Sequence, residues 1–259
     1  MPFVEYGDLR GHYALTGAAS APVLILSNSL GTNFSMWDPQ LPALEKEFRV
    51  LRYDTRGHGQ TSVTPGPYSI EQLSRDVLGL LDALHADRAH FCGLSMGGMI
   101  GMWLGAHAAE RVHKIVLCNT AAKIGTAETW SARIEAVRKG GMQAVAPAVI
   151  ERWFTPEFRA SAPAIVAPAL RMLENSPPEG YMACCAALGA MDQREALTAI
   201  RVPTLVITGA KDPVTPPAEG RFLAERIPGA QYAELATAHL SNVEAPAQFT
   251  AELIRFLKA

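Results

Sequence analysis

Long hydrophobic runs are missing from this sequence. No part of its 259 residues reaches the roughly 18 uninterrupted apolar residues that a membrane-spanning helix needs. The opening Met-Pro-Phe-Val-Glu-Tyr also lacks the basic stretch and apolar run of a secretory signal peptide. We therefore expect a cytoplasmic protein that has no contact with a membrane and is not exported.

An excess of basic residues is missing too. The chain has 23 Lys and Arg against 25 Asp and Glu, which gives a formal net charge of −2. Because binding to a phosphate backbone depends on a broad basic surface, this balance argues against nucleic acid as a partner.

Cysteine is scarce, and its positions argue against disulfides and metal. Of the four cysteines, Cys92 and Cys118 lie in apolar runs, where we expect buried thiols. Cys184 and Cys185 are neighbours in a helical stretch, where a disulfide between them would be strained. No Cys/His spacing resembles a zinc site and no Gly-rich loop is followed by Lys-Ser/Thr, so we expect no metal and no P-loop.

Strand and helix alternate along most of the chain. Short apolar runs indicate strands buried on both faces, with segments of helical spacing between them, and this predicts an α/β fold whose mostly parallel sheet is flanked by helices. Residues 3–6 and 12–15 are expected to form antiparallel edge strands, and residues 243–257 a closing amphipathic helix. The expected central strands are 23–26, 50–53, 89–92, 114–118 and 204–207, and the expected helices are 70–85, 95–109 and 217–227.

The alternation lapses over residues 121–197, where Ala, Met, Arg and Pro dominate and strand-like runs are missing. The stretch is too long for a plain crossover. On an open α/β sheet such an insertion lies over the carboxyl ends of the strands, where ligands bind. We predict a helical cap at 121–197 that lines the substrate pocket, on a core formed by 1–120 and 198–259.

The sharpest motif is Gly-Leu-Ser-Met-Gly at residues 93–97. It fits the Gly-x-Ser-x-Gly nucleophile elbow, in which small residues flank a serine held in a tight, strained turn between a strand and a helix. The pattern alone is common, and a plain Gly-rich turn is the alternative. Its place between an expected strand and an expected helix favours Ser95 as a nucleophile.

A serine hydroxyl needs a base to take its proton, and histidine titrates in the right range. After a nucleophile elbow the carboxylate and then the histidine follow in chain order, with the histidine near the end. Of the seven histidines, His239 alone meets this requirement, on an expected loop before the last helix. The other six are interpreted as surface or core residues.

The carboxylate that orients the histidine is expected on the loop after the penultimate strand, which supplies Asp212. The loop after Cys118 offers Asn119 but no carboxylate, and Asp192 lies within the expected cap. The alternative for Asp212 is a turn formed with Pro213.

An oxyanion needs backbone donors, expected from the residue after the nucleophile and from an earlier strand-to-helix loop. These are Met96 and Leu30. Leu30 lies in Ser-Asn-Ser-Leu-Gly-Thr at 27–32, and Asn-Ser stands there where related enzymes commonly carry His-Gly. The polar, Gly-rich segment 53–62 follows a strand that supplies no member of the triad, so we interpret it as a structural loop.

With these motifs the chain resembles the α/β-hydrolase superfamily over nearly its full length. Within it, the segments 27–32, 36–40 and 93–98 and the cap segment Glu-Arg-Trp-Phe-Thr-Pro-Glu-Phe at 151–158 resemble bacterial 3-oxoadipate enol-lactonases. The elbow is shared across the superfamily, whereas 27–32 and 151–158 are more specific to this family.

The resemblance implies hydrolysis of 3-oxoadipate enol-lactone to 3-oxoadipate, in the β-ketoadipate pathway of aromatic compound degradation, with no cofactor. The partner is then a small lactone, and the oligomeric state is left open. Because this substrate carries a free carboxylate, a cation should meet it in a mostly apolar pocket. Arg133 is the candidate, with Trp130 as a wall. The equal alternative is a solvated Arg133 and a Trp130 in the core of the cap.

Other activities remain as alternatives. A general carboxylesterase uses the same triad, and fold does not fix the substrate. A carbon-carbon bond hydrolase of this fold is a further reading. A non-catalytic binding protein is expected to have lost a member of the triad, and a haloalkane dehalogenase usually carries aspartate where Ser95 stands.

Overall fold

The computed structural model describes residues 2–259, which contain one eight-stranded sheet. The strands are β1 (Phe3–Tyr6), β2 (Leu9–Thr16), β3 (Val23–Ser27), β4 (Arg49–Tyr53), β5 (Ala89–Leu94), β6 (Val112–Cys118), β7 (Thr204–Gly209) and β8 (Gln231–Leu235). Their order across the sheet is β1-β2-β4-β3-β5-β6-β7-β8. β2 pairs antiparallel with β1 and with β4, and every other neighbouring pair is parallel.

Helices connect most of the strands. The α-helices are α1 (Leu41–Leu44), α2 (Ile70–Ala83), α3 (Met96–His107), α4 (Ala127–Gly140), α5 (Ala146–Trp153), α6 (Pro156–Ser161), α7 (Pro163–Glu174), α8 (Pro178–Ala190), α9 (Pro217–Arg226), α10 (Ser241–Glu244) and α11 (Pro246–Lys258). The 3₁₀ helices are η1 (Phe34–Gln40), η2 (Ala109–Arg111), η3 (Met142–Ala144) and η4 (Ala196–Ala199).

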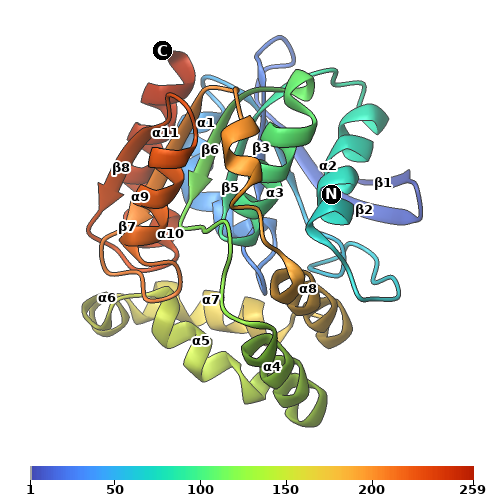
Figure 1. Cartoon of the computed structure of the whole chain (residues 1–259), viewed down its shortest axis with the longest axis vertical. Coiled ribbons are helices and arrows are strands. Elements are labelled where there is room, and N and C mark those ends of the chain that lie inside the picture. The colour runs from blue at the N-terminus through green and yellow to red at the C-terminus, as the bar shows by residue number, and fades with distance from the viewer. Residues whose placement is uncertain (1) are drawn as a thin grey trace.

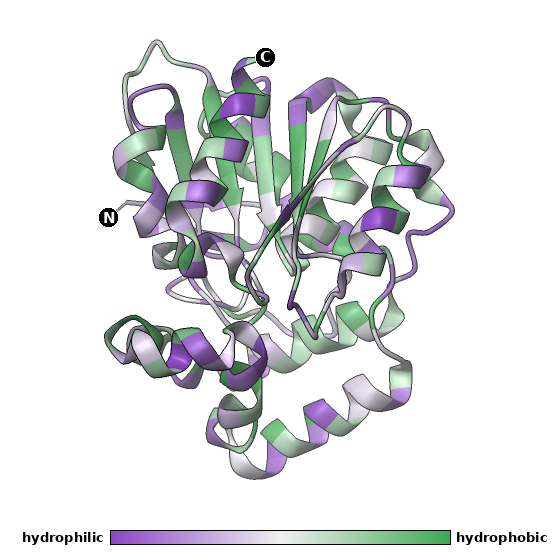
Figure 2. Cartoon of the chain, turned by 90° about the vertical axis from the view of Figure 1, so that its left-hand side faces the viewer, coloured by the Kyte–Doolittle hydropathy of each residue, from purple (hydrophilic) through white to green (hydrophobic). Residues whose placement is uncertain are grey.

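The sheet forms the hydrophobic centre of the molecule. All residues of β5 and β7 are buried, as expected for strands covered on both faces. α2 and α3 pack together on one face, and α11 contacts α1 and η1 on the other. Figure 2 shows the hydrophobic strands between helices whose outer surfaces are more hydrophilic.

The helices α4 to α8 form a separate layer at one end of the sheet, below the strands in Figure 1. They all lie between β6 and β7 in the sequence, α4 packs along α8, and α5 packs against α7. The loops after β3, β5, β7 and β8 face this layer, because their residues and those of α4, α5 and α8 line one cavity.

The predicted α/β fold with a mostly parallel sheet is confirmed. Two local predictions are wrong. β2 is not an edge strand, because β1 takes the edge and β2 pairs on both sides. The closing helix is not continuous: α10 ends at Glu244 and α11 begins at Pro246. Proline lacks the N–H that a continuous helix needs but fits the first turn of a new one.

The four cysteines are buried free thiols, and Cys92 and Cys118 lie side by side with their sulfur atoms 3.8 Å apart.

Over residues 2–259, none of the helices combines the length and the apolar character needed to cross a bilayer.

Candidate active site

Ser95 lies at the junction of β5 and α3, in a backbone conformation that is rare for a residue with a side chain. Its φ is 56° and its ψ is −113°, a sparsely populated region that persists only where neighbouring structure holds it. Two contacts with the end of β6 hold it here. The Ser95 amide donates to the Cys118 carbonyl over 2.8 Å, and the Thr120 hydroxyl donates to the Ser95 carbonyl over 2.7 Å.

Glycine is required on both sides of Ser95 because other backbone passes very close. A Cβ on Gly93 would lie 2.1 Å from the carbonyl oxygen of Gly97, and a Cβ on Gly97 would lie 2.3 Å from that of Ser27. No side chain fits at such distances. The elbow is therefore held between β3 and α3, and the serine is the one residue of the turn whose side chain faces the cavity.

His239 and Asp212 form a buried pair at the same end of the sheet. The Nδ1 atom of His239 lies 2.8 Å from Oδ2 of Asp212, on the loops that follow β8 and β7. The exposed fractions of the two residues are only 2% and 3%. His239 lines the cavity that Ser95 also lines.

Asp212 is held in its charged form by the groups around it. Burial alone would raise the pKa of Asp212, but the charge of His239 and hydrogen bonds from His239, Asn119 and Thr215 hold it below its usual range. Its Oδ1 accepts from the amides of Val214 and Thr215, over 2.7 and 3.1 Å. Its Oδ2 accepts from the Thr215 hydroxyl and from Nδ2 of Asn119, over 2.8 and 3.0 Å. A carboxylate with this many donors is fixed in place and remains ionised.

The rival positions for the carboxylate have other roles. Asp192 forms ion pairs with Arg194 and Lys123 near the surface. Asn119 is not a substitute for the carboxylate but its partner: its amide binds Asp212, and its Oδ1 accepts from the Ser241 hydroxyl over 2.5 Å.

The loop after β3 carries Leu30 beside the elbow. The carbonyl of Asn28 accepts from the Gly97 amide over 3.0 Å, so this loop is joined directly to α3. The side chain of Asn28 donates to the Tyr53 carbonyl and accepts from the Trp37 indole, over 2.7 and 2.9 Å. Asn28 thus holds this loop in place, although Asn-Ser stands here where related enzymes commonly carry His-Gly. Leu30 lines the cavity of Ser95.

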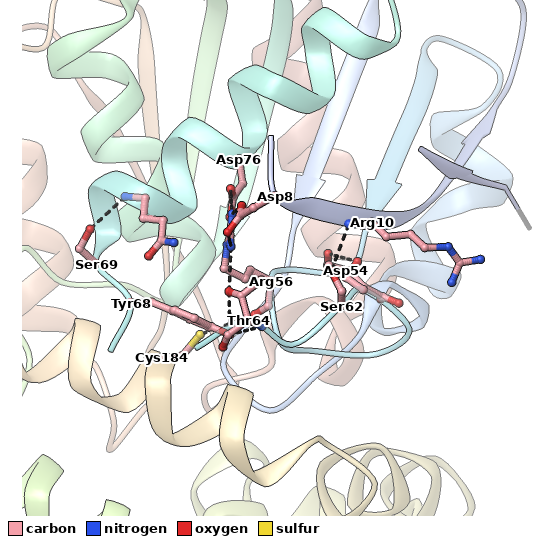
Figure 3. Close-up of polar contacts among 12 residues, drawn as sticks. Asp8, Arg10, Asp54, Arg56, Ser62, Thr64, Tyr68, Ser69, Asp76 and Cys184 are labelled. Atoms are coloured by element: carbon pink, nitrogen blue, oxygen red, sulfur yellow. Dashed lines mark hydrogen bonds and ion pairs between the residues drawn. The ribbon is translucent and has the colours of Figure 1, made fainter. Parts of the chain in front are cut away.

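The loop after β4 supports the loop of Leu30. His58 is fully buried, and its Nε2 accepts from the Gly31 amide over 3.0 Å. The loop is itself held by Arg56, whose guanidinium binds the carboxylates of Asp76 and Asp8 (Figure 3). It also donates to the Thr64 hydroxyl over 2.8 Å. The interpretation of this segment as a structural loop agrees with these contacts.

The cavity at Ser95 is small and adjoins a larger one, with which it shares several lining residues. The inner cavity measures about 40 Å³ and the adjoining one, beside Pro213 and Val214, about 260 Å³. One water needs roughly 10–15 Å³ of such space, so the inner cavity holds only a few waters. A ligand larger than this has to extend toward the outer cavity. The residues that line both cavities are Ile124, Trp130, Arg133, Arg152 and Val214.

Two arginines of the helical layer therefore face the same space. The guanidinium of Arg133, on α4, lies 5.0 Å from the centre of the Trp130 ring, and Nε of Arg152, on α5, donates to the Ala148 carbonyl over 3.0 Å. Among the residues that the structure describes, neither arginine has a carboxylate as an ion-pair partner. Burial and the charge of Arg133 lower the pKa of Arg152. Two unbalanced cations in one partly buried space favour an anion there.

Metal ligands do not gather at this site or elsewhere in the described part of the chain, residues 2–259: no three His, Cys, Asp or Glu side chains are grouped closely enough to hold an ion.

Comparison with known proteins gives the family. Residues 22–161 match the family model described as the alpha/beta hydrolase fold. The chain belongs to the α/β-hydrolase family. It is 47% identical to 3-oxoadipate enol-lactonase 2 of Acinetobacter baylyi, over 93% of this chain and 91% of that one. It is 41% identical to enol-lactonase 1 of the same organism, over 95% and 92%.

A solved structure agrees with these relatives. The crystal structure of the enol-lactonase from Burkholderia xenovorans superimposes with a TM-score of 0.98 and 47% identity, over 100% of both chains. The resemblance to enol-lactonases is therefore confirmed, and this α/β-hydrolase is an enzyme of the ester-hydrolysing type.

In this α/β-hydrolase, the sequence does not indicate the roles of several residues of the site. Arg152 lies in the cap segment 151–158, and nothing in the sequence indicates that it lines the same cavity as Arg133. The sequence does not distinguish His58 from the histidines that are interpreted as surface or core residues. Asn119 carries no carboxylate, but its place after a central strand, like that of Asp212, does indicate a position at the same end of the sheet.

Proposed function

We propose that this α/β-hydrolase hydrolyses the enol-lactone of 3-oxoadipate to 3-oxoadipate through a Ser-His-Asp triad. The relatives at 41–47% identity that carry this name support the substrate. The observation that carries the proposal is the pair Arg133 and Arg152, without carboxylate partners, in the cavity that contains Ser95 and His239. An ester with a free carboxylate at its far end matches that arrangement.

In the proposed mechanism Ser95 is the nucleophile, His239 the general base and Asp212 the group that orients it. His239 takes the proton of the Ser95 hydroxyl as it attacks the lactone carbonyl. Asp212 binds Nδ1 of the imidazole, so the other ring nitrogen is the one that accepts the proton, and the carboxylate stabilises the imidazolium that forms. The amides of Leu30 and Met96 donate to the oxyanion of the tetrahedral intermediate.

Opening of the ring releases an enol, which is a better leaving group than an ordinary alkoxide. It receives its proton from His239 and tautomerises to a ketone, which no longer attacks the acyl-enzyme. Ring opening is therefore one-way. Water that is activated by His239 then attacks the acyl-enzyme, releases 3-oxoadipate and restores Ser95.

Arg133 binds the free carboxylate of the lactone, with Trp130 as a wall, and we add Arg152 as the second cation. A lactone placed with its carbonyl at Ser95 extends from the inner cavity toward both guanidinium groups, which line inner and outer cavities alike. Hydrogen bonds between guanidinium and carboxylate are charge-assisted, so they both strengthen binding of the lactone and fix its orientation. Residues 121–197 act in this proposal as the cap over the core of 1–120 and 198–259.

The proposal places the reaction in the β-ketoadipate pathway of aromatic compound degradation, in the cytoplasm, with a small lactone as partner and no part for nucleic acid or a membrane.

The test is a steady-state assay on freshly generated 3-oxoadipate enol-lactone, beside p-nitrophenyl acetate and a Ser95→Ala control. A kcat/KM for the lactone far above that for the aryl ester, and lost in Ser95→Ala, is the expected result. Brisk ester turnover without lactone activity would overturn the substrate and leave a carboxylesterase. Full activity in Ser95→Ala would overturn the mechanism.

A further inference from the structure

The loop that carries His239 is held by hydrogen bonds on both sides of the histidine, one to Glu244 of α10 and one to the helical layer. On one side, the amide of Ala238 donates to Oε2 of Glu244 over 2.9 Å. On the other, the amide of Leu240 donates over 3.0 Å to the carbonyl of Trp153, the last residue of α5. The residues before and after the histidine are thus each fixed by one hydrogen bond.

Glu244 connects the same loop to the segment that follows Trp153. Its second oxygen, Oε1, accepts from the amide of Thr155 over 3.3 Å and from the Thr155 hydroxyl. Thr155 is also the N-cap of α6, where its Oγ1 accepts from the Phe158 amide over 3.2 Å. One carboxylate therefore joins a residue next to His239 to the start of a helix that is 89 positions from Glu244 in the sequence.

The chemistry of these contacts requires a carboxylate. Both oxygens of Glu244 accept, one from the loop of His239 and the other from the segment at Thr155. A glutamine has only one accepting oxygen, and its NH2 group on the other side would face the Thr155 N–H and leave only the Thr155 hydroxyl to accept from it. Glutamine at position 244 would therefore keep one of the two connections and weaken the other.

The segment at Trp153 also contributes to the wall of the cavity, where it would contact a bound ligand. The Trp153 side chain lines the cavity with Ser95 and His239, while its carbonyl binds the Leu240 amide. Displacement of residues 153–155 therefore shifts the backbone on both sides of His239. Proton transfer is sensitive to such shifts, because misplacement by about 1 Å costs roughly a hundredfold in rate.

We propose that Glu244 is a positioning residue that couples residues 153–155 of the helical layer to the alignment of His239 with Ser95. The proposal rests on the role of His239 as general base. Contact of a substrate with Trp153 then aligns the base, and loss of the Glu244 connection leaves His239 in place but poorly aligned.

The experiment compares Glu244→Gln, Thr155→Val and the double variant, with Glu225→Gln as a matched control. Glu225 is an exposed glutamate of α9. The readouts are kcat and KM for p-nitrophenyl acetate, the rate at which phenylmethanesulfonyl fluoride modifies Ser95, and Tm. Both reagents are small and uncharged, so the readouts report on the base and not on carboxylate binding.

We expect Glu244→Gln to lower kcat and the modification rate by about tenfold or more, with KM within about twofold. Thr155→Val should also lower kcat and the modification rate, by a smaller factor than Glu244→Gln. The double variant should be no slower than Glu244→Gln alone. Glu225→Gln should match the wild type. Thr155→Val keeps the test decisive should Glu244→Gln fail to fold, because it replaces one hydroxyl by a methyl group, at the cost of the α6 N-cap, and leaves the backbone amide of residue 155 to bind Glu244.

The proposal is overturned if Glu244→Gln lowers Tm but leaves both rates unchanged, or if the effects of the two substitutions simply add. Failure of the proposed function looks different: the wild type itself would then lack Ser95-dependent ester hydrolysis and would resist modification of Ser95.

Discussion

Nε2 of His58 accepts a hydrogen bond from the amide of Gly31 over 3.0 Å, so a histidine of one loop fixes the residue next to Leu30 in another. Burial lowers the pKa of His58, which keeps the ring neutral. Its Nδ1 lies 3.3 Å from the Arg56 carbonyl, and a neutral ring that accepts at Nε2 donates at Nδ1. A protonated ring would have no acceptor for Gly31.

His58→Leu should therefore displace the loop of Leu30, the proposed oxyanion donor. We expect kcat for p-nitrophenyl acetate to fall by about tenfold, since removal of one oxyanion donor costs roughly 10²–10³ in kcat and Leu30 would be displaced, not removed. His58→Gln, whose side-chain oxygen can accept from Gly31, should restore part of the rate. His107→Gln, at an exposed position of α3, serves as control. Equal rates for His58→Leu and wild type would contradict this role of His58.

Asp212→Asn should lower kcat by about 10³–10⁴-fold at neutral pH while the protein stays folded. The amide of asparagine cannot stabilise an imidazolium and favours the wrong tautomer of His239. The comparison is Asp192→Asn, which alters only a surface group paired with Arg194 and Lys123. Its kcat is expected within about twofold of the wild type, as for most surface changes. A similar loss in both variants would argue against Asp212.

Arg152→Met should raise KM for the enol-lactone by about 10- to 100-fold, the range for loss of one charge-assisted hydrogen bond. Arg133→Met should act in the same direction. Neither change should alter kcat/KM for the uncharged p-nitrophenyl acetate by more than about threefold. The control is Arg138→Met, on the exposed side of α4. An equal loss on the charged and the uncharged ester would contradict carboxylate binding.

Acid should destabilise the protein through His90. Burial, followed by the charges of His113, Lys114 and Arg88, lowers the pKa of His90 to about 4. Because an unfolded histidine titrates near pH 6.5, the unfolded chain binds more protons below that pH. Stability should therefore fall as pH drops from about 6.5 toward 4. Tm measured against pH should show this slope, and His90→Gln should make it shallower, whereas His107→Gln should not.

Local sequence patterns were sufficient for the parts of the fold and the site that depend on local structure. Strands buried on both faces leave uninterrupted apolar runs, so β3 to β7 were predicted within a few residues. The turn at Ser95 needs small neighbours, and that need is visible as glycine at 93 and 97. The chain order of serine, aspartate and histidine led to residues that the structure brings to one end of the sheet.

The other features of the fold and the site depend on packing between segments that are distant in the sequence. A local sequence pattern carries no information about such packing. Arg152 and Arg133 line the same cavity although they lie on different helices, α5 and α4. Glu244 meets Thr155 across 89 positions, and β2 lies inside the sheet because β1 covers it. The break before Pro246 is different, because proline is a local signal for the start of a helix. The amphipathic pattern continues on both sides of Pro246 and favoured one continuous helix.

The backbone of Ser95 has a consequence for the evolution of the enzyme. A serine at φ 56° and ψ −113° stores on the order of 1–3 kcal/mol of strain, which a glycine at this position would largely relieve. Ser95→Gly should therefore melt at a higher temperature than the wild type. Selection for thermostability alone would remove the proposed nucleophile early, so the proposed reactivity and the stability oppose each other at this residue.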